Sequence, residues 1–167
     1  MMKRLGVGLI LLTLLLFAAS GVTHAQAPKW VVGGNMLLSI STGGWGGASA
    51  GFTFGPMAEV VFNRQLAVGT EFNIYTTTGT PIEWATYFKY YIDAKSSKLK
   101  PYVDGGLGLV FATGGPYFAF RFGGGVGFQV ARGIWIGPDL QLGPVFVTGS
   151  TSFVILIRGG FRYELPS

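Results

Sequence analysis

Charged residues in this chain lie at alternate positions inside otherwise apolar segments. In segment 82–92, Glu83 and Lys89 have the same parity, and the residues of the opposite parity carry no charge. All charges of segment 152–165 likewise share one parity. Because successive residues of a β-strand point to opposite faces, this spacing predicts strands with one polar face and one face free of charge.

The same alternation occurs in eight segments, which are separated by residues typical of turns. We expect strands at 30–40, 51–62, 66–75, 82–92, 101–112, 117–130, 134–147 and 152–165. At one end the connections are two tight turns and a charged one, at 63–65, 131–133 and 93–100. At the other end they are poor in charge and rich in Gly, Ser and Thr, at 41–50, 76–81, 113–116 and 148–151.

The chain has too few charges to cover an ordinary water-facing surface. Only 11% of its residues are charged, whereas about 25% is usual for a soluble domain. A soluble lipocalin-like barrel would need an outer face crowded with Lys and Glu, but the polar faces here consist mostly of Gly, Ala and single charges. Small residues suit the interior of a tight eight-stranded barrel, so we expect the polar face inside and the apolar face against lipid.

Backbone pairing then decides the fold class. An open sheet edge would leave N–H and C=O groups unpaired in hydrocarbon, at several kcal/mol for each group. Eight is an allowed strand number, and strands of roughly ten residues match a tilted membrane span. The sequence therefore predicts an all-β fold, an eight-stranded antiparallel transmembrane β-barrel with up-and-down meander topology. We expect 41–50 to face the exterior and 93–100 the periplasm.

The first residues have the features of a secretory signal. Lys3 and Arg4 precede an apolar stretch at 5–19, and Thr23-His24-Ala25 places small residues at the positions that a signal peptidase reads. We expect cleavage after Ala25, so that residues 1–25 are the signal peptide and 26–167 form a single barrel domain; the alternative is an uncleaved anchor helix. Cleavage would leave 142 of the 167 residues, with ten Lys+Arg and seven Asp+Glu and without the single histidine.

Two motifs resemble a known family. KPYVDGGLGL at 100–109 is similar to a Pro-Tyr-Val-x-x-Gly-x-Gly strand, and RGGFRYEL at 158–165 closes the chain as a final strand. Together with a signal followed directly by strands, they resemble the small outer-membrane β-barrels of diderm bacteria, the eight-stranded class that includes the OmpA transmembrane domain, OmpX and OmpW. Family members usually finish on an aromatic residue, whereas Pro166 and Ser167 follow Leu165 here.

The resemblance implies a location and partners. It implies a bacterial outer-membrane location, outer-membrane lipid as the surrounding partner, and insertion by the barrel-assembly machinery. We expect a monomer that binds no nucleic acid.

Chemistry on a substrate is not expected. Barrel enzymes of the outer membrane rely on histidine, and the mature chain has none. Glu59 and Glu71, on neighbouring strands, are the only plausible carboxylate pair for acid–base work, and membership of an ion network is the simpler interpretation of both. With no Cys and no credible phosphate-binding loop, we expect no catalytic, cofactor or metal site.

Inward charges predict a polar network in the lumen, because buried charges are costly unless they are paired. By height along the strands, Lys89 is expected beside Asp104, Asp139 beside Arg158, and Glu71 beside Lys89. The network has two interpretations, a polar plug that fixes the barrel or a narrow path for ions or solutes. The expected members are Glu59, Glu71, Lys89, Asp104, Arg121, Asp139, Arg158 and Arg162.

Three Gly-Pro pairs lie inside predicted strands with the proline on the lipid face: Pro56, Pro138 and Pro144. Proline cannot donate to the ladder, so these pairs predict either bulges or a lateral seam through which an apolar molecule could pass. We expect a porin-like envelope barrel with a structural or surface-interaction role. The alternative is a narrow channel or carrier for small or apolar solutes with lateral access to the bilayer.

Overall fold

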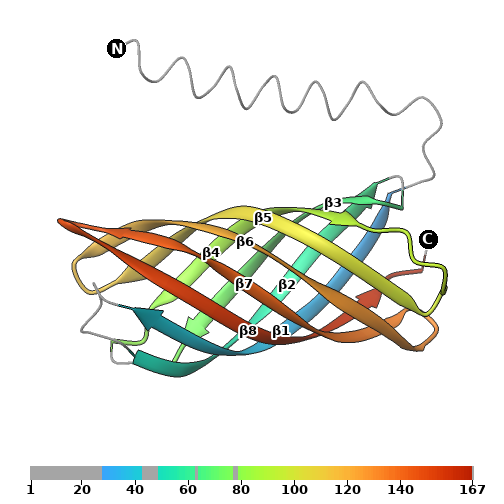
Figure 1. Cartoon of the computed structure of the whole chain (residues 1–167), viewed down its shortest axis with the longest axis horizontal. Coiled ribbons are helices and arrows are strands. Elements are labelled where there is room, and N and C mark those ends of the chain that lie inside the picture. Colours follow the sequence, from blue (N-terminus) through green and yellow to red (C-terminus); the bar gives the residue numbers. More distant parts are fainter. Residues whose placement is uncertain (1–27, 43–48, 63, 77–78, 167) are drawn as a thin grey trace, which may run out of the picture.

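The protein is a closed barrel of eight strands (Figure 1). The computed structural model describes residues 28–42, 49–62, 64–76 and 79–166. The strands are β1 (Lys29–Thr42), β2 (Ser49–Phe62), β3 (Leu66–Tyr75), β4 (Ile82–Tyr91), β5 (Leu99–Ala112), β6 (Gly115–Ala131), β7 (Ile134–Val147) and β8 (Ser150–Glu164). The described residues include no helix of the length and hydropathy needed to span a membrane.

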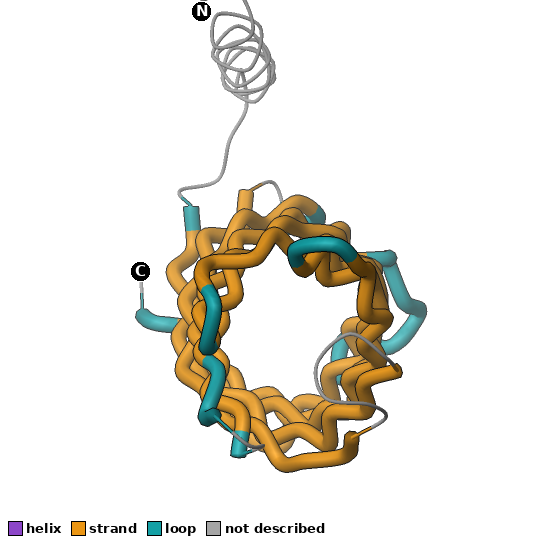
Figure 2. Tube along the Cα trace, turned by 90° about the vertical axis from the view of Figure 1, so that its left-hand side faces the viewer, coloured by secondary structure: helices purple, strands orange, loops and turns teal. Residues whose placement is uncertain are grey.

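Each strand pairs antiparallel with its neighbours in the chain, and β1 pairs with β8. The view along the barrel in Figure 2 shows the continuous ring that results. The predicted all-β, eight-stranded up-and-down barrel is therefore confirmed. The expected signal peptide and its cleavage after Ala25 lie outside the described residues.

Several strands run further toward the uncharged connections than the sequence predicted. The cause is that two of these connections are two-residue hairpins. Ala112 pairs with Gly115, and Val147 pairs with Ser150. Gly114 and Gly149 occupy the second hairpin position with φ values of 102° and 79°, a region that glycine enters without steric cost. The barrel end that holds residues 41–50, 76–81, 113–114 and 148–149 is called the loop end below, and the opposite end the turn end.

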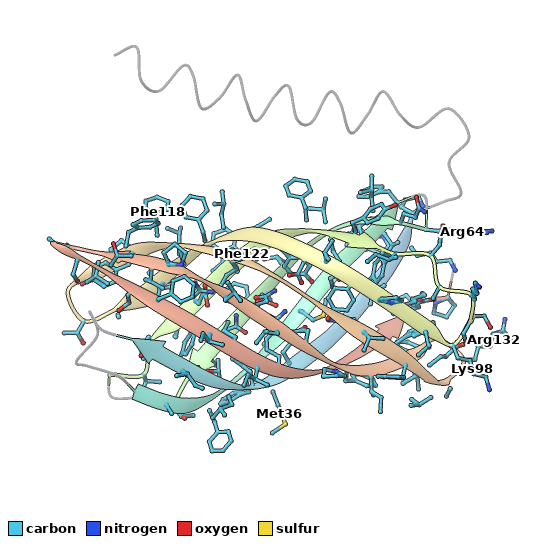
Figure 3. The ribbon with its side chains drawn as sticks, in the orientation of Figure 1. Met36, Arg64, Lys98, Phe118, Phe122 and Arg132 are labelled. Atoms are coloured by element: carbon cyan, nitrogen blue, oxygen red, sulfur yellow. The ribbon has the colours of Figure 1, made fainter. Side chains whose placement is uncertain are left out.

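The parity of the side chains separates an apolar exterior from a polar interior. Met36 and Phe118 project outward and are 75% and 66% exposed (Figure 3). Lys89 and Glu59 point inward and are 2% and 1% exposed. A soluble barrel would bury the former and expose the latter, so this surface fits hydrocarbon and not water.

The lumen also contains an apolar cluster, which the sequence analysis did not identify. It lies toward the loop end, where side chains from six strands meet across the barrel. Leu156, Val110 and Val145 are among its most buried members. The cluster comprises Leu37, Tyr75, Val110, Tyr117, Ala119, Val145, Val154 and Leu156, with Ala112 and Val147 packed against it.

Arginine at two adjacent positions of β7 tests the assignment of faces. Leu140 is 45% exposed on the lipid face, and Gln141 is buried in the lumen, where its amide donates to Asp104. Leu140→Arg should destabilise the folded barrel in lipid vesicles by about 2 to 4 kcal/mol, because it places a charge near the bilayer midplane. Gln141→Arg should avoid that penalty. Equal losses in reversible urea unfolding of both variants would contradict the assigned faces.

Candidate functional site, a network of charges across the lumen

All eight charged residues predicted for the lumen are buried there. They come from β2 to β8 and point inward because each has the polar parity of its strand. Glu83 of β4 joins them, also buried. The interior thus holds five carboxylates (Glu59, Glu71, Glu83, Asp104, Asp139) and four cations (Lys89, Arg121, Arg158, Arg162).

Arg158 on β8 lies at the centre of the network. Its Nη1 donates to both carboxylate oxygens of Glu71 on β3, at 2.8 and 2.9 Å. Its Nε and Nη2 donate to Asp139 on the neighbouring strand β7, the latter at 3.0 Å. A planar guanidinium is suited to such a double contact. One side chain therefore ties opposite walls of the barrel together.

The carboxylate of Glu71 is further held by two amides. Asn35 Nδ2 donates to Oε2 at 3.1 Å, and Asn73 Nδ2 donates to Oε1 at 3.0 Å. Asp104 is held less closely, since its Oδ2 accepts from Gln141 Nε2 at 3.1 Å and lies 3.9 Å from Arg158. Its only ion pair among the described residues is this long one with Arg158, which also binds Glu71 and Asp139.

Nearer the turn end, Lys89 forms an ion pair with Glu59 of β2, with 2.5 Å between Nζ and Oε2. Tyr87 donates a hydrogen bond to the same carboxylate at 3.1 Å, and Tyr91 donates to its other oxygen. The ammonium also lies 4.7 Å from the centre of the Tyr102 ring, within the range of a cation–π contact.

Of the two neighbours predicted for Lys89, Asp104 is confirmed and Glu71 is wrong. Lys89 does face Asp104 in the β4–β5 register, but its ammonium pairs with Glu59, because the long side chain reaches over the lumen. Glu71 does not adjoin Lys89, since the β3–β4 register places Ala67 there and Glu71 opposite Ala85. The predicted Asp139–Arg158 neighbours are confirmed.

Arg162 connects these two groups of charges. Its Nη2 donates to Tyr102 Oη at 2.7 Å, and Tyr102 donates in turn to Asp139 Oδ2 at 2.7 Å. Arg162 is also 3.5 Å from Asp139. Tyrosine hydroxyls therefore act as bridges, which charge spacing in the sequence does not reveal.

Toward the loop end, Arg121 of β6 pairs with Glu83 of β4 at 2.8 Å. Tyr75 donates to the second oxygen of Glu83 and also belongs to the apolar cluster. The polar network thus continues directly into the apolar cluster. At the turn end, Lys100 contacts Glu164 and lies 4.1 Å from the Trp135 ring centre, beside a hollow of about 20 Å³.

The two carboxylates of the predicted acid–base pair are held by different cations. Glu59 binds Lys89, and Glu71 binds Arg158. Within the described residues, no group of three or more His, Cys, Asp or Glu side chains is placed to hold a metal ion. What the geometry provides is a set of buried, paired charges that fills the barrel cross-section.

The three Gly-Pro pairs coincide with interruptions of the ladder. The β2–β3 pairing skips Gly55 and Pro56, and the β6–β7 pairing skips both Gly-Pro pairs of β7. At each of these glycines the backbone of an adjacent strand approaches closely. A Cβ on Gly55 would lie 1.4 Å from the carbonyl oxygen of Phe72 on β3. The corresponding distances at Gly137 and Gly143 are 1.8 and 1.9 Å. Each Gly-Pro pair therefore removes one backbone N–H donor from the ladder, while its glycine allows the two neighbouring strands to stay in contact.

A hollow lies on the lipid-facing wall where β1, β2, β7 and β8 run side by side. Its volume is about 710 Å³, and it is rich in glycine because outward positions such as Gly34 and Gly159 have no side chain. Pro56 lies at its edge, together with Met36 and Phe161. Two of the predicted seam segments, Gly55-Pro56 and Gly137, thus border one groove, whereas Pro144 is elsewhere.

Comparison with known proteins identifies the fold. No protein-family model and no curated protein matches the sequence. Neisserial surface protein A matches with a TM-score of 0.68 at 14% identity, over 84% of this chain and 100% of that chain. The N-terminal β-barrel domain of Pseudomonas aeruginosa OprF matches with a TM-score of 0.57 at 11% identity, over 80% and 97%.

Outer membrane protein OprG from Pseudomonas aeruginosa matches with a TM-score of 0.54 at 8% identity, over 84% of this chain and 98% of that chain. At such identities the likeness concerns the fold. The predicted resemblance to small eight-stranded outer-membrane barrels is confirmed at that level.

The Lys89–Glu59 pair offers a test of the network. Lys89→Met leaves a buried carboxylate without its nearest cation, so we expect the barrel in lipid vesicles to lose about 3 to 5 kcal/mol of folding free energy. Lys89→Met combined with Glu59→Gln removes both charges, keeps an acceptor oxygen for one of the two tyrosines Tyr87 and Tyr91, and should regain a large part of that loss. Urea unfolding followed by tryptophan fluorescence measures both. A double variant no more stable than the single one would show that pairing is unimportant.

Proposed function

We propose that this protein is an integral outer-membrane barrel with a sealed lumen and a structural or surface-interaction role in the cell envelope. The observation that carries the proposal is the filling of the lumen. Ion pairs from β2 to β8 cross the barrel at successive heights, and the apolar cluster lies beyond them. Ions would have to break buried pairs and then pass the buried apolar side chains of the cluster, which is costly at both steps.

The surface also favours a passive envelope role over specific recognition. The connections at the loop end carry no Asp, Glu, Lys or Arg, and two of them are two-residue hairpins. Such connections offer few side chains for binding a ligand. The fold shared with Neisserial surface protein A, OprF and OprG supports the outer membrane as the location. We further propose a monomer without enzymatic activity.

Conductance of the refolded protein in planar lipid bilayers tests the sealed lumen. We expect no discrete current steps, under conditions in which a general porin added to the same bilayer gives them. Regular steps would contradict the proposal. If Arg162→Gln, at the turn end of the network, also changed the ion selectivity of those steps, the path would run through the lumen and the narrow channel would replace the sealed barrel.

The groove on the lipid-facing wall favours a second candidate function, a carrier that takes up an apolar chain laterally from the bilayer. The hollow opens toward hydrocarbon, and its outward side chains, such as Met36, Phe54 and Phe161, are apolar. A lipid acyl chain is therefore the occupant that fits. The ladders at the two borders of this wall, β2–β3 and β6–β7, are both interrupted at Gly-Pro pairs.

Filling the groove distinguishes the carrier from the sealed barrel. A Cβ on Gly159 would meet only Met36 O, at 3.9 Å, so Gly159→Leu should place a side chain in the hollow without a backbone clash and obstruct it. A carrier should exchange a fluorescent fatty acid faster than protein-free vesicles do, and Gly159→Leu should abolish that excess. Gly105→Leu is the matched control, because Gly105 lies outside the groove at an outward position of β5 where a Cβ would meet only Arg121 O, at 3.7 Å, and it should leave exchange unchanged. Equal exchange with and without the parent protein would eliminate the carrier.

A further inference from the structure

The charges outside the lumen lie almost entirely at one end of the barrel. The turn end has six basic residues and two acidic ones, whereas all four connections at the loop end are uncharged. Figure 3 shows Arg64, Lys98 and Arg132 together at the turn end, directed away from the barrel. The basic residues are Lys29, Arg64, Lys95, Lys98, Lys100 and Arg132, and the acidic ones are Asp93 and Glu164.

The two acidic residues at the turn end balance only part of its positive charge. Glu164 contacts Lys100 and lies 4.0 Å from Lys29, and Asp93 accepts a hydrogen bond from Gln65 at 2.8 Å. Lys95, Lys98 and Arg132 are exposed, and no ion pair joins them to another of the described residues. The two acids therefore do not neutralise the end as a whole.

These cations directly flank the apolar exterior. Arg64 lies in the turn between Phe62 and Leu66, which are 39% and 52% exposed. Lys29 precedes Trp30, and Lys98 precedes Leu99, both of which face outward. A basic side chain at the edge of a lipid-facing surface lies at the height of the headgroup phosphates, to which Lys and Arg donate charge-assisted hydrogen bonds.

We propose that the turn end is a binding surface for anionic phospholipid headgroups, formed by Lys29, Arg64, Lys95, Lys98 and Arg132. The proposal rests on the membrane-spanning barrel of the proposed function and adds a lipid preference confined to one end. A soluble acidic protein is a weaker match, because these cations lie beside exposed apolar side chains at the edge of the lipid-facing surface. The uncharged loop end has no corresponding donors, so it should not select anionic lipid.

Quenching of tryptophan fluorescence by brominated lipid measures which lipid lies next to each end of the barrel. Trp30 at the turn end is 56% exposed, and Trp84 near the loop end is 46% exposed. Two single-tryptophan proteins, each with the remaining tryptophans replaced by Phe, are refolded into phosphatidylcholine vesicles. A fixed small fraction of the lipid is brominated, either as phosphatidylcholine or as phosphatidylglycerol.

We expect brominated phosphatidylglycerol to associate with the Trp30 site about threefold or more better than brominated phosphatidylcholine does. At Trp84 the ratio should be close to one. High salt should lower the Trp30 ratio, because exposed charges are screened. Lys29→Gln with Arg132→Gln, at the start of β1 and in the β6–β7 turn, should bring the Trp30 ratio to about one, whereas the charge-conserving pair Lys29→Arg and Arg132→Lys should retain it.

Equal ratios at Trp30 and Trp84, or a preference that survives in the neutral pair, would overturn the proposed lipid surface. Quenching of both tryptophans by brominated phosphatidylcholine serves as the internal reference. If it is present, the barrel is embedded and only the lipid preference fails. If it is absent, the membrane-spanning barrel fails as well.

Discussion

The pairing of β1 with β8 is the constraint on which the rest of the structure depends. Hydrocarbon offers no partner for a free N–H or C=O, so an eight-stranded sheet with this exterior is stable in lipid only when its first and last strands meet. Their register runs without interruption from Val31 opposite Glu164 to Thr42 opposite Phe153. Because the sheet is closed, alternate side chains of every strand face either the lipid or the lumen.

A closed eight-stranded barrel is narrow, and its interior must be filled. Glycine provides room where large side chains lie opposite, as Gly69 does for Tyr87 and Gly108 does for Glu83. The charges that remain inside are removed from water and are tolerable only in pairs. Arg158, which bridges β3 and β7, meets this requirement and at the same time fixes the cross-section. The paired charges inside the lumen are thus a consequence of closure on a small circumference.

Much of this follows from parity in the sequence, because a strand obliges its residues to alternate between faces. The eight strands, the polar interior and the Asp139–Arg158 contact were all predictable in this way. The partner of Lys89, the Tyr102 bridge and the apolar cluster were not, because they join strands across the lumen. Such contacts depend on the stagger of the strands around the barrel, which alternation along a single strand does not determine. The Glu83–Arg121 pair was missed for the same reason.

Amide hydrogen exchange of the barrel in lipid nanodiscs, resolved by residue with NMR, tests closure most directly. The central amides of β1 and β8 that face one another, around Leu38 and Ile157, should exchange as slowly as those between β5 and β6, around Leu107 and Phe120. Exchange of the β1–β8 amides within minutes, with the other ladders still protected, would mean that the first and last strands are not joined and would contradict the closed barrel.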